Sequence, residues 1–155
     1  MTEVIAALIA AAAVLIGYLV NQVANRRAEK TKVFAEAIEA VADYQEMPYR
    51  IRRRPAPDAA SRLALSERVS DIQKRIDFHR AWLSIESTKV GDAYEALVSA
   101  VRKEAGEHMK SAWEEPLITA DDQMSLGVAY SCPGTQAARI TCMQAMQQHL
   151  RRWWQ

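Results

Sequence analysis

The side chains that come closest to a chemical site are a few acids and histidines. Glu104 and His108 lie four residues apart, so a helix places them on one face. A helical hairpin that turns near residue 87 would bring Glu67 opposite His108. Such a cluster has the ingredients of a metal or proton-transfer site, but two ligand types at one place are weak evidence, and ordinary ion pairing or partial burial explains them better. We therefore predict no metal site, no cofactor and no catalytic residue.

The chain also lacks the motifs of nucleophilic and phosphate-binding chemistry. It contains no Gly-x-Ser-x-Gly, no phosphate-binding loop, no His-Glu-x-x-His and no glycine-rich dinucleotide turn. Cys132 and Cys142 match neither a zinc spacing nor a Cys-x-x-Cys pair. We predict that both stay thiols in the cytoplasm, whereas the opposite topology would allow a disulfide between them. The sequence predicts that the protein is not an enzyme.

The most distinctive element is an uncharged apolar block, residues 4–20. As a helix it is about 26 Å long, close to the thickness of a bilayer's hydrocarbon core. Glu3, not a basic segment, precedes it, which argues against a cleaved signal peptide. A buried helix of a soluble bundle rarely lacks polar positions altogether. We therefore predict a transmembrane anchor over residues 1–24.

Charge around the block predicts its orientation. Basic residues follow it, at Arg26, Arg27, Lys30 and Lys32, and none precedes it. Because basic flanks stay on the cytoplasmic side, we predict a single-pass protein of the cell (inner) membrane with its N-terminus outside and its C-terminal domain cytoplasmic. Small residues recur on one face of the span and would let it self-associate into a homo-oligomer, unless they only reflect abundant alanine: Ala6, Ala10, Ala13 and Gly17.

The remainder predicts an all-α fold in three parts. Residues 25–57 form a helical stalk that Pro48 ends, followed by a linker rich in arginine and proline. Residues 58–115 form an antiparallel helical hairpin within a small helical bundle that the stalk completes. Residues 116–155 form an irregular connection and an amphipathic helix over about 136–154. A single long rod over 65–113 is the alternative to the hairpin.

Two apolar seams support the hairpin, because each repeats at spacings of four and three as in a coiled coil. The first comprises Leu65, Val69, Ile72, Ile76, His79 and Leu83. The second comprises Val90, Tyr94, Leu97, Val101, Ala105, His108 and Ala112. We predict the turn near residues 86–89, where Ser87 and Thr88 offer capping hydroxyls.

Two cationic segments are candidate contacts for a partner or a membrane surface. The first is the run Arg52, Arg53 and Arg54 in the predicted linker, which a solvated linker explains as well. The second closes the chain and combines tryptophans with arginines, as interfacial helices do: Leu150, Arg151, Arg152, Trp153 and Trp154. Packing of that last helix on the protein's own bundle is the alternative.

These features predict a membrane-anchored scaffold or interaction protein that is not an enzyme. Its partners would be the lipid bilayer and a protein at the membrane, with nucleic acid an improbable partner. The alternative function is a holin-like or exclusion-type small protein that oligomerises and perturbs the bilayer. The alanine- and arginine-rich composition resembles small membrane proteins of bacteria and phage, although no family motif accompanies the likeness.

Overall fold

The computed structural model describes the backbone of residues 1–120, 123 and 130–151, and all side chains there except those of residues 3 and 6–12. Within these residues the chain forms four α-helices and no strand. They are α1 (Thr2–Arg52), α2 (Ala59–Glu86), α3 (Thr88–Glu114) and α4 (Pro133–Arg151). The predicted all-α class is confirmed.

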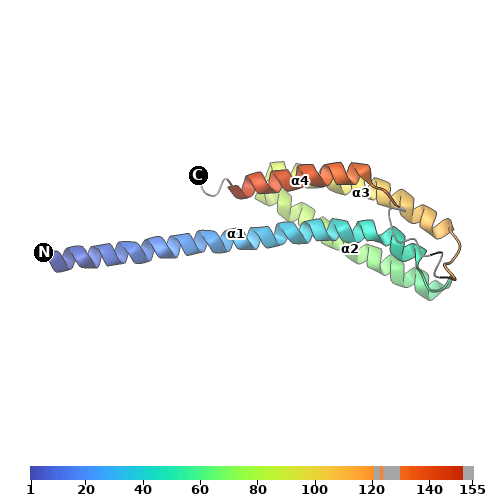
Figure 1. The fold of residues 1–155 in the computed structure, drawn as a ribbon, viewed down its shortest axis with the longest axis horizontal. Helices are drawn as coiled ribbons and strands as arrows, with labels where there is room; N and C mark the ends of the chain where they lie inside the picture. Colours follow the sequence, from blue (N-terminus) through green and yellow to red (C-terminus); the bar gives the residue numbers. More distant parts are fainter. Residues whose placement is uncertain (121–122, 124–129, 152–155) are drawn as a thin grey trace.

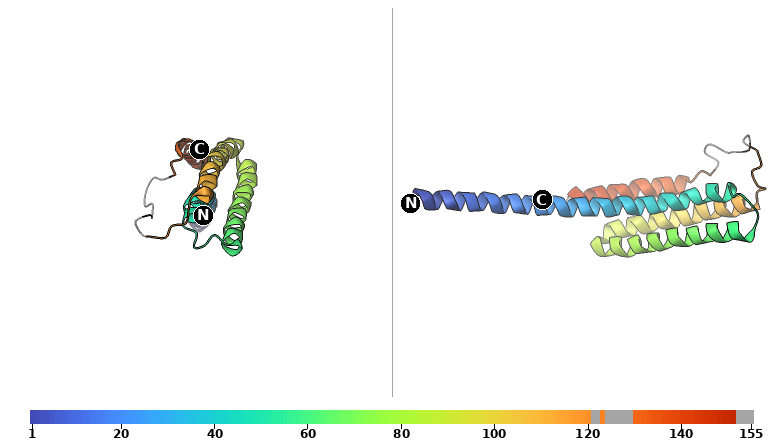
Figure 2. Two further views of the ribbon diagram at one scale, coloured as in Figure 1. Left: turned by 90° about the vertical axis from the view of Figure 1, so that its right-hand side faces the viewer. Right: turned by 90° about the horizontal axis from the view of Figure 1, so that it is seen from below.

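The four helices run alternately up and down, and α1 is far longer than the others. Its C-terminal half packs with α2 and α3 as a three-helix bundle, while its N-terminal half projects beyond the other helices (Figures 1 and 2). Helix α4 runs antiparallel to α1, so its C-terminal end returns toward the projecting arm. It packs chiefly on α3 and touches α1 little.

The hairpin prediction is correct, and the single rod is wrong. One residue, Ser87, separates α2 from α3, and its side chain accepts a hydrogen bond from the backbone N–H of Val90 at 3.4 Å. The helices approach closely there, since a Cβ on Gly91 would lie 2.8 Å from the Cα of Ser84. Both predicted seams supply core residues, among them Ile72, Ile76, His79, Leu83, Val90, Tyr94, Leu97 and Val101.

The stalk prediction needs a correction at its end. Helix α1 does not stop at Pro48 but continues through it to Arg52. Proline in a helix costs one hydrogen bond and about 3 kcal/mol. Burial of Met47 and Ile51 on either side of Pro48 offsets that cost, because both side chains are almost fully enclosed. The predicted linker therefore shortens to residues 53–58.

The last helix buries only part of its apolar side: Met146 is 4% exposed and Leu150 is partly buried against the core. The core side of α4 is made of small or medium residues, including Thr135, Cys142, Ala145 and Met146. Ile140 and Met143, by contrast, are 52% and 43% exposed. The core side is thus mostly small, while two of the larger apolar side chains, Ile140 and Met143, are left outside.

The structure does not support the predicted anchor. Over the residues that it describes, no helix has an apolar stretch long enough to cross a bilayer. The membrane span therefore stays a prediction.

Candidate functional site

The projecting arm of α1 exposes large apolar side chains on every side. Val14, Leu15 and Ile16 are 73%, 59% and 61% exposed. Ala13 and Gly17, from the predicted self-association face, are also exposed, and a Cβ on Gly17 would meet nothing within 4 Å. Ala6 and Ala10 lie in the helix, but their side chains are outside the described residues.

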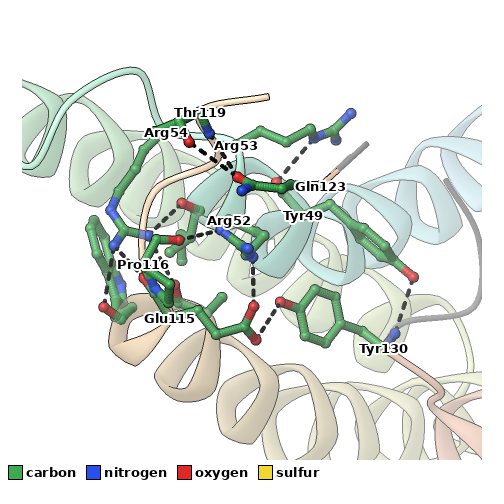
Figure 3. A network of polar contacts seen from close by, with 12 residues as sticks. Tyr49, Arg52, Arg53, Arg54, Glu115, Pro116, Thr119, Gln123 and Tyr130 are labelled. Atoms are coloured by element: carbon green, nitrogen blue, oxygen red, sulfur yellow. Dashed lines mark hydrogen bonds and ion pairs between the residues drawn. The ribbon is translucent and has the colours of Figure 1, made fainter. Parts of the chain in front are cut away.

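The arginine run is built into the fold rather than displayed by a linker (Figure 3). Arg52 pairs with the Glu115 carboxylate at 2.5 Å, and its guanidinium also donates to the carbonyl of Pro116. Arg53 is exposed and pairs with Glu46 at 2.5 Å. The solvated-linker interpretation is therefore wrong for Arg52, which belongs to α1 and bridges to the end of α3.

Arg54 is buried, with 8% of its surface exposed, and it closes the C-terminal end of α3. Its guanidinium donates to the carbonyls of Ala112 and Glu115 at 2.9 Å each, and to the carbonyl of Ile51 at 3.0 Å. It also lies 5.2 Å from the centre of the Trp113 ring. The last carbonyls of a helix lack N–H donors from their own helix. At the end of α3 the Arg54 guanidinium supplies these missing donors.

The structure describes only two of the five C-terminal residues that were predicted to contact a partner or a membrane surface. Leu150 is partly buried against the core, and Arg151, the last residue of α4, is exposed. Arg152, Trp153 and Trp154 lie outside the described residues. Helix α4 itself packs on the bundle, as the alternative interpretation of this segment expected.

An apolar groove lies between α1 and α4, because the two helices touch so little. This α1/α4 groove has a volume of about 400 Å³, and Phe34, Ala35, Ile38, Met143, Met146 and Leu150 form most of its lining. A second hollow continues it along the arm and shares Thr31 and Ala35 with it; its other lining residues are Ala24, Arg27, Ala28 and Lys32. Sequence reasoning missed the groove because its two walls belong to α1 and α4, which are distant in sequence, so no local pattern reveals that they line one groove.

Glu104 and His108 of α3 form hydrogen bonds to residues at the start of α4 and just before it. The Glu104 carboxylate accepts hydrogen bonds from the backbone N–H groups of Gly134 and Thr135, both at 2.8 Å, and from the Thr135 hydroxyl at 2.7 Å. Burial raises the pKa of Glu104, but these hydrogen bonds and the charge of His108 outweigh burial, so the pKa falls below its usual value. Nε2 of His108 lies 2.9 Å from the Ser131 carbonyl.

Glu67 is exposed on α2, and the hydrogen bonds of Glu104 and His108 go instead to Ser131, Gly134 and Thr135. Across the described part of the chain, no three His, Cys, Asp or Glu side chains gather closely enough to hold a metal ion.

A second polar cluster ties three helices together at the end of the bundle nearest the arm. The Glu86 carboxylate of α2 pairs with Lys30 of α1 and lies 2.8 Å from Nε2 of His149 on α4. Burial raises the pKa of Glu86, but hydrogen bonds from Lys30 and His149 outweigh it and lower the pKa. The three residues are distant in sequence, so no local pattern reveals them.

The two cysteines are buried free thiols. Burial raises the pKa of the Cys142 thiol to about 11, which makes it a poor nucleophile. Cys132 directly precedes α4 and Cys142 lies within it. Ten residues of helical rise separate the two Cα atoms by about 15 Å, whereas a disulfide needs less than about 7 Å. A bridge would thus require α4 to unwind, so the thiols do not report on orientation.

Comparison with known proteins gives no relative from which a function could be transferred: no protein-family model, no curated protein and no solved structure matches the chain.

Proposed function

We propose that the chain is a single-pass, membrane-anchored helical scaffold that acts through binding rather than catalysis. The observation that carries the proposal is the exposure of Val14, Leu15 and Ile16, three successive residues of one helix. Successive residues point about 100° apart, so together they cover most of the helix circumference. A partner helix covers one side of such a segment, whereas lipid surrounds it.

The basic residues give the orientation of this proposal. Arg26, Arg27, Lys30 and Lys32 follow the apolar block, and Glu3 precedes it. By the positive-inside rule the bundle lies on the cytoplasmic side and the N-terminus outside. The anchor then confines the bundle to two dimensions and raises its effective concentration toward partners in the same membrane.

Membrane association is tested by carbonate extraction and flotation of the full-length chain. We expect the chain to float with lipid and to stay in the membrane at high pH. Recovery of the intact chain as a monodisperse species in a detergent-free aqueous fraction would refute the anchor.

Orientation requires an introduced thiol, because the native cysteines are buried. We would place one cysteine at the exposed Gln144 and another, in a separate variant, at the exposed Thr2. With a membrane-impermeant maleimide, Thr2→Cys should label in intact cells and Gln144→Cys only after lysis. The reverse pattern would invert the topology. The unmodified chain serves as the background control.

The membrane-active alternative predicts a different phenotype on expression. A scaffold leaves the membrane potential unchanged, whereas a holin-like protein collapses it quickly. Exposed Ala13 and Gly17 are compatible with close packing of several copies. Rapid depolarisation that is lost in a Trp153→Ala, Trp154→Ala variant would favour the alternative over the scaffold.

A further inference from the structure

The α1/α4 groove is an apolar surface that none of the residues described by the structure covers. One wall is the α1 face that carries Ala35 and Ile38, and the other is the α4 face that carries Met143 and Leu150. Ala35 and Met143 are exposed although the groove around them is apolar. Methionine side chains adapt to differently shaped apolar ligands, which suits a binding surface better than a rigid core.

The groove is continuous with a narrow stripe on the projecting arm. Ala24, Ala28, Thr31, Ala35 and Ile38 follow one another at spacings of four and three, so they share one face of α1. From Ala24 to Ile38 this face is about 21 Å long, or four helical turns. Its small residues let another helix approach closely. The length of this face therefore fits one further helix that lies along α1. One end of that helix would lie in the groove between α1 and α4.

Charge around the stripe selects among occupants. Arg27 and Lys32 line the hollow on the arm, and α4 contains no Asp or Glu and ends on Arg151. Lys32 is 4.0 Å from Glu36, an exposed pair whose mutual attraction is weak and screened. An occupant with carboxylates at its arm-side end is complementary to these cations.

A second copy of this chain is a poor occupant for the same reason. Two anchored copies share one orientation, so a pair formed through this face would be parallel. In parallel helices, residues five apart on facing chains meet at the edges of the interface. Arg27 of each copy would then meet Lys32 of the other, and like charges oppose the pairing.

Position along α1 argues against a lipid occupant. If the apolar block ends at Val20, Thr31 lies about 16 Å beyond it. The headgroup layer is only about 6 Å thick on each side of the hydrocarbon core. The groove proper, which begins near Thr31, thus lies outside the bilayer and open to proteins.

We propose that the α1/α4 groove binds an amphipathic helix of a partner protein whose end nearest the membrane carries acidic residues. The proposal rests on the scaffold function and names its docking site and the chemistry of its partner. Binding buries the exposed faces of Ala35 and Met143 and places the helix's carboxylates in the positive potential of Arg27 and Lys32, without requiring that either cation lack another partner.

The test uses the purified full-length chain in nanodiscs of uncharged lipid. The fluorescent probes are four-turn helical peptides with a Leu/Ala face. One glutamate probe carries two glutamates at its N-terminal end, and the other carries two glutamates at its C-terminal end. A matched probe carries lysines at those positions. We expect one glutamate probe to bind at least ten times more tightly than its lysine counterpart by fluorescence anisotropy, with affinity falling as salt rises.

Variants locate the binding. Ala35→Trp fills the groove and should weaken the glutamate probe at least tenfold. Ala81→Trp places the same bulk on an exposed position of α2 and should change nothing. A chain with Arg27→Glu and Lys32→Glu should reverse the preference toward the lysine probe. Circular dichroism of each variant checks that the bundle remains folded.

Several outcomes would overturn the proposal. They are equal affinity for acidic and basic probes, no binding of either glutamate probe, and binding that Ala35→Trp leaves intact. Efficient disulfide cross-linking between two Ala35→Cys chains, accompanied by loss of probe binding, would assign the groove to a second copy. Protection of that cysteine by anionic lipid alone would assign it to lipid. Flotation is scored separately, so a chain that floats without binding probe loses only the groove proposal.

Discussion

Replacing Arg54 by alanine should destabilise the bundle more than any other single change in the arginine run. The carbonyl of Ala112 has no donor in its own helix, because the residue four positions later is Pro116, which lacks an N–H. Arg54 donates to that carbonyl and to Glu115, each at 2.9 Å. Alanine leaves these carbonyls without the donor and removes the contact with Trp113.

The magnitude follows from those contacts. A hydrogen bond from a charged donor contributes about 1.5–3 kcal/mol, and a cation over an aromatic ring adds about 0.5–1 kcal/mol. Two strong hydrogen bonds and the ring contact, reduced for water that enters the cavity, give a loss of about 3–4 kcal/mol in the free energy of unfolding. Arg54→Lys keeps the charge but not the planar fork, so about half of that loss should remain.

The neighbouring arginine is the matched control. Arg53 and Glu46 form a pair whose side chains are 42% and 44% exposed. Such pairs contribute less than about 1 kcal/mol, so Arg53→Ala should be nearly neutral. Guanidinium denaturation of the full-length chain in one fixed detergent, followed by circular dichroism and tryptophan fluorescence, measures both variants. If Arg54→Ala lies within about 1 kcal/mol of Arg53→Ala, the capping argument fails.

Two substitutions and one labelling experiment test other parts of the fold. Glu104→Gln should lower stability at neutral pH. The pKa of Glu104 is depressed, so its contribution is complete above the ordinary carboxyl pKa and disappears as pH falls through the folded-state value; wild type and variant should therefore converge in acid denaturation curves. Gly91→Ala should lower the thermal midpoint, because the new Cβ would lie 2.8 Å from the Cα of Ser84; an unchanged midpoint would show that the hairpin relaxes freely. Cys142 should react with a small maleimide only after denaturation, and rapid labelling of the native chain would contradict its burial.

Much of the bundle could be predicted because its seams are local and periodic. Ile72 and Ile76 on α2, and Tyr94 and Leu97 on α3, repeat at helical spacing and are buried as expected. The turn also has a local signal, since Ser87 caps α3. In each case the residues that reveal the element are neighbours in sequence, so no tertiary information is needed.

The candidate sites were less predictable because their chemistry depends on distant partners. Arg54 looks like part of a solvated linker until α3 brings Ala112 and Glu115 to it, and these residues lie 58 and 61 positions away. Pro48 ends an isolated helix, but burial of Met47 and Ile51 carries α1 through it. Tertiary contacts override the local preference in both places.

Helix α4 shows the same principle with a functional consequence. Its sequence offers two faces to pack, one lined by Cys142 and Ala145 and one lined by Ile140 and Met143. Burying a large apolar side chain contributes about 1.5–3 kcal/mol, so the second face alone would favour packing inward. The bundle instead buries the small face, and α4 packs through it chiefly against α3. Two large apolar side chains, Ile140 and Met143, remain at the surface, and Met143 lines the groove beside α1. Among the residues that the structure describes, nothing covers this apolar face, and the proposed docking of a partner helix depends on that exposed surface.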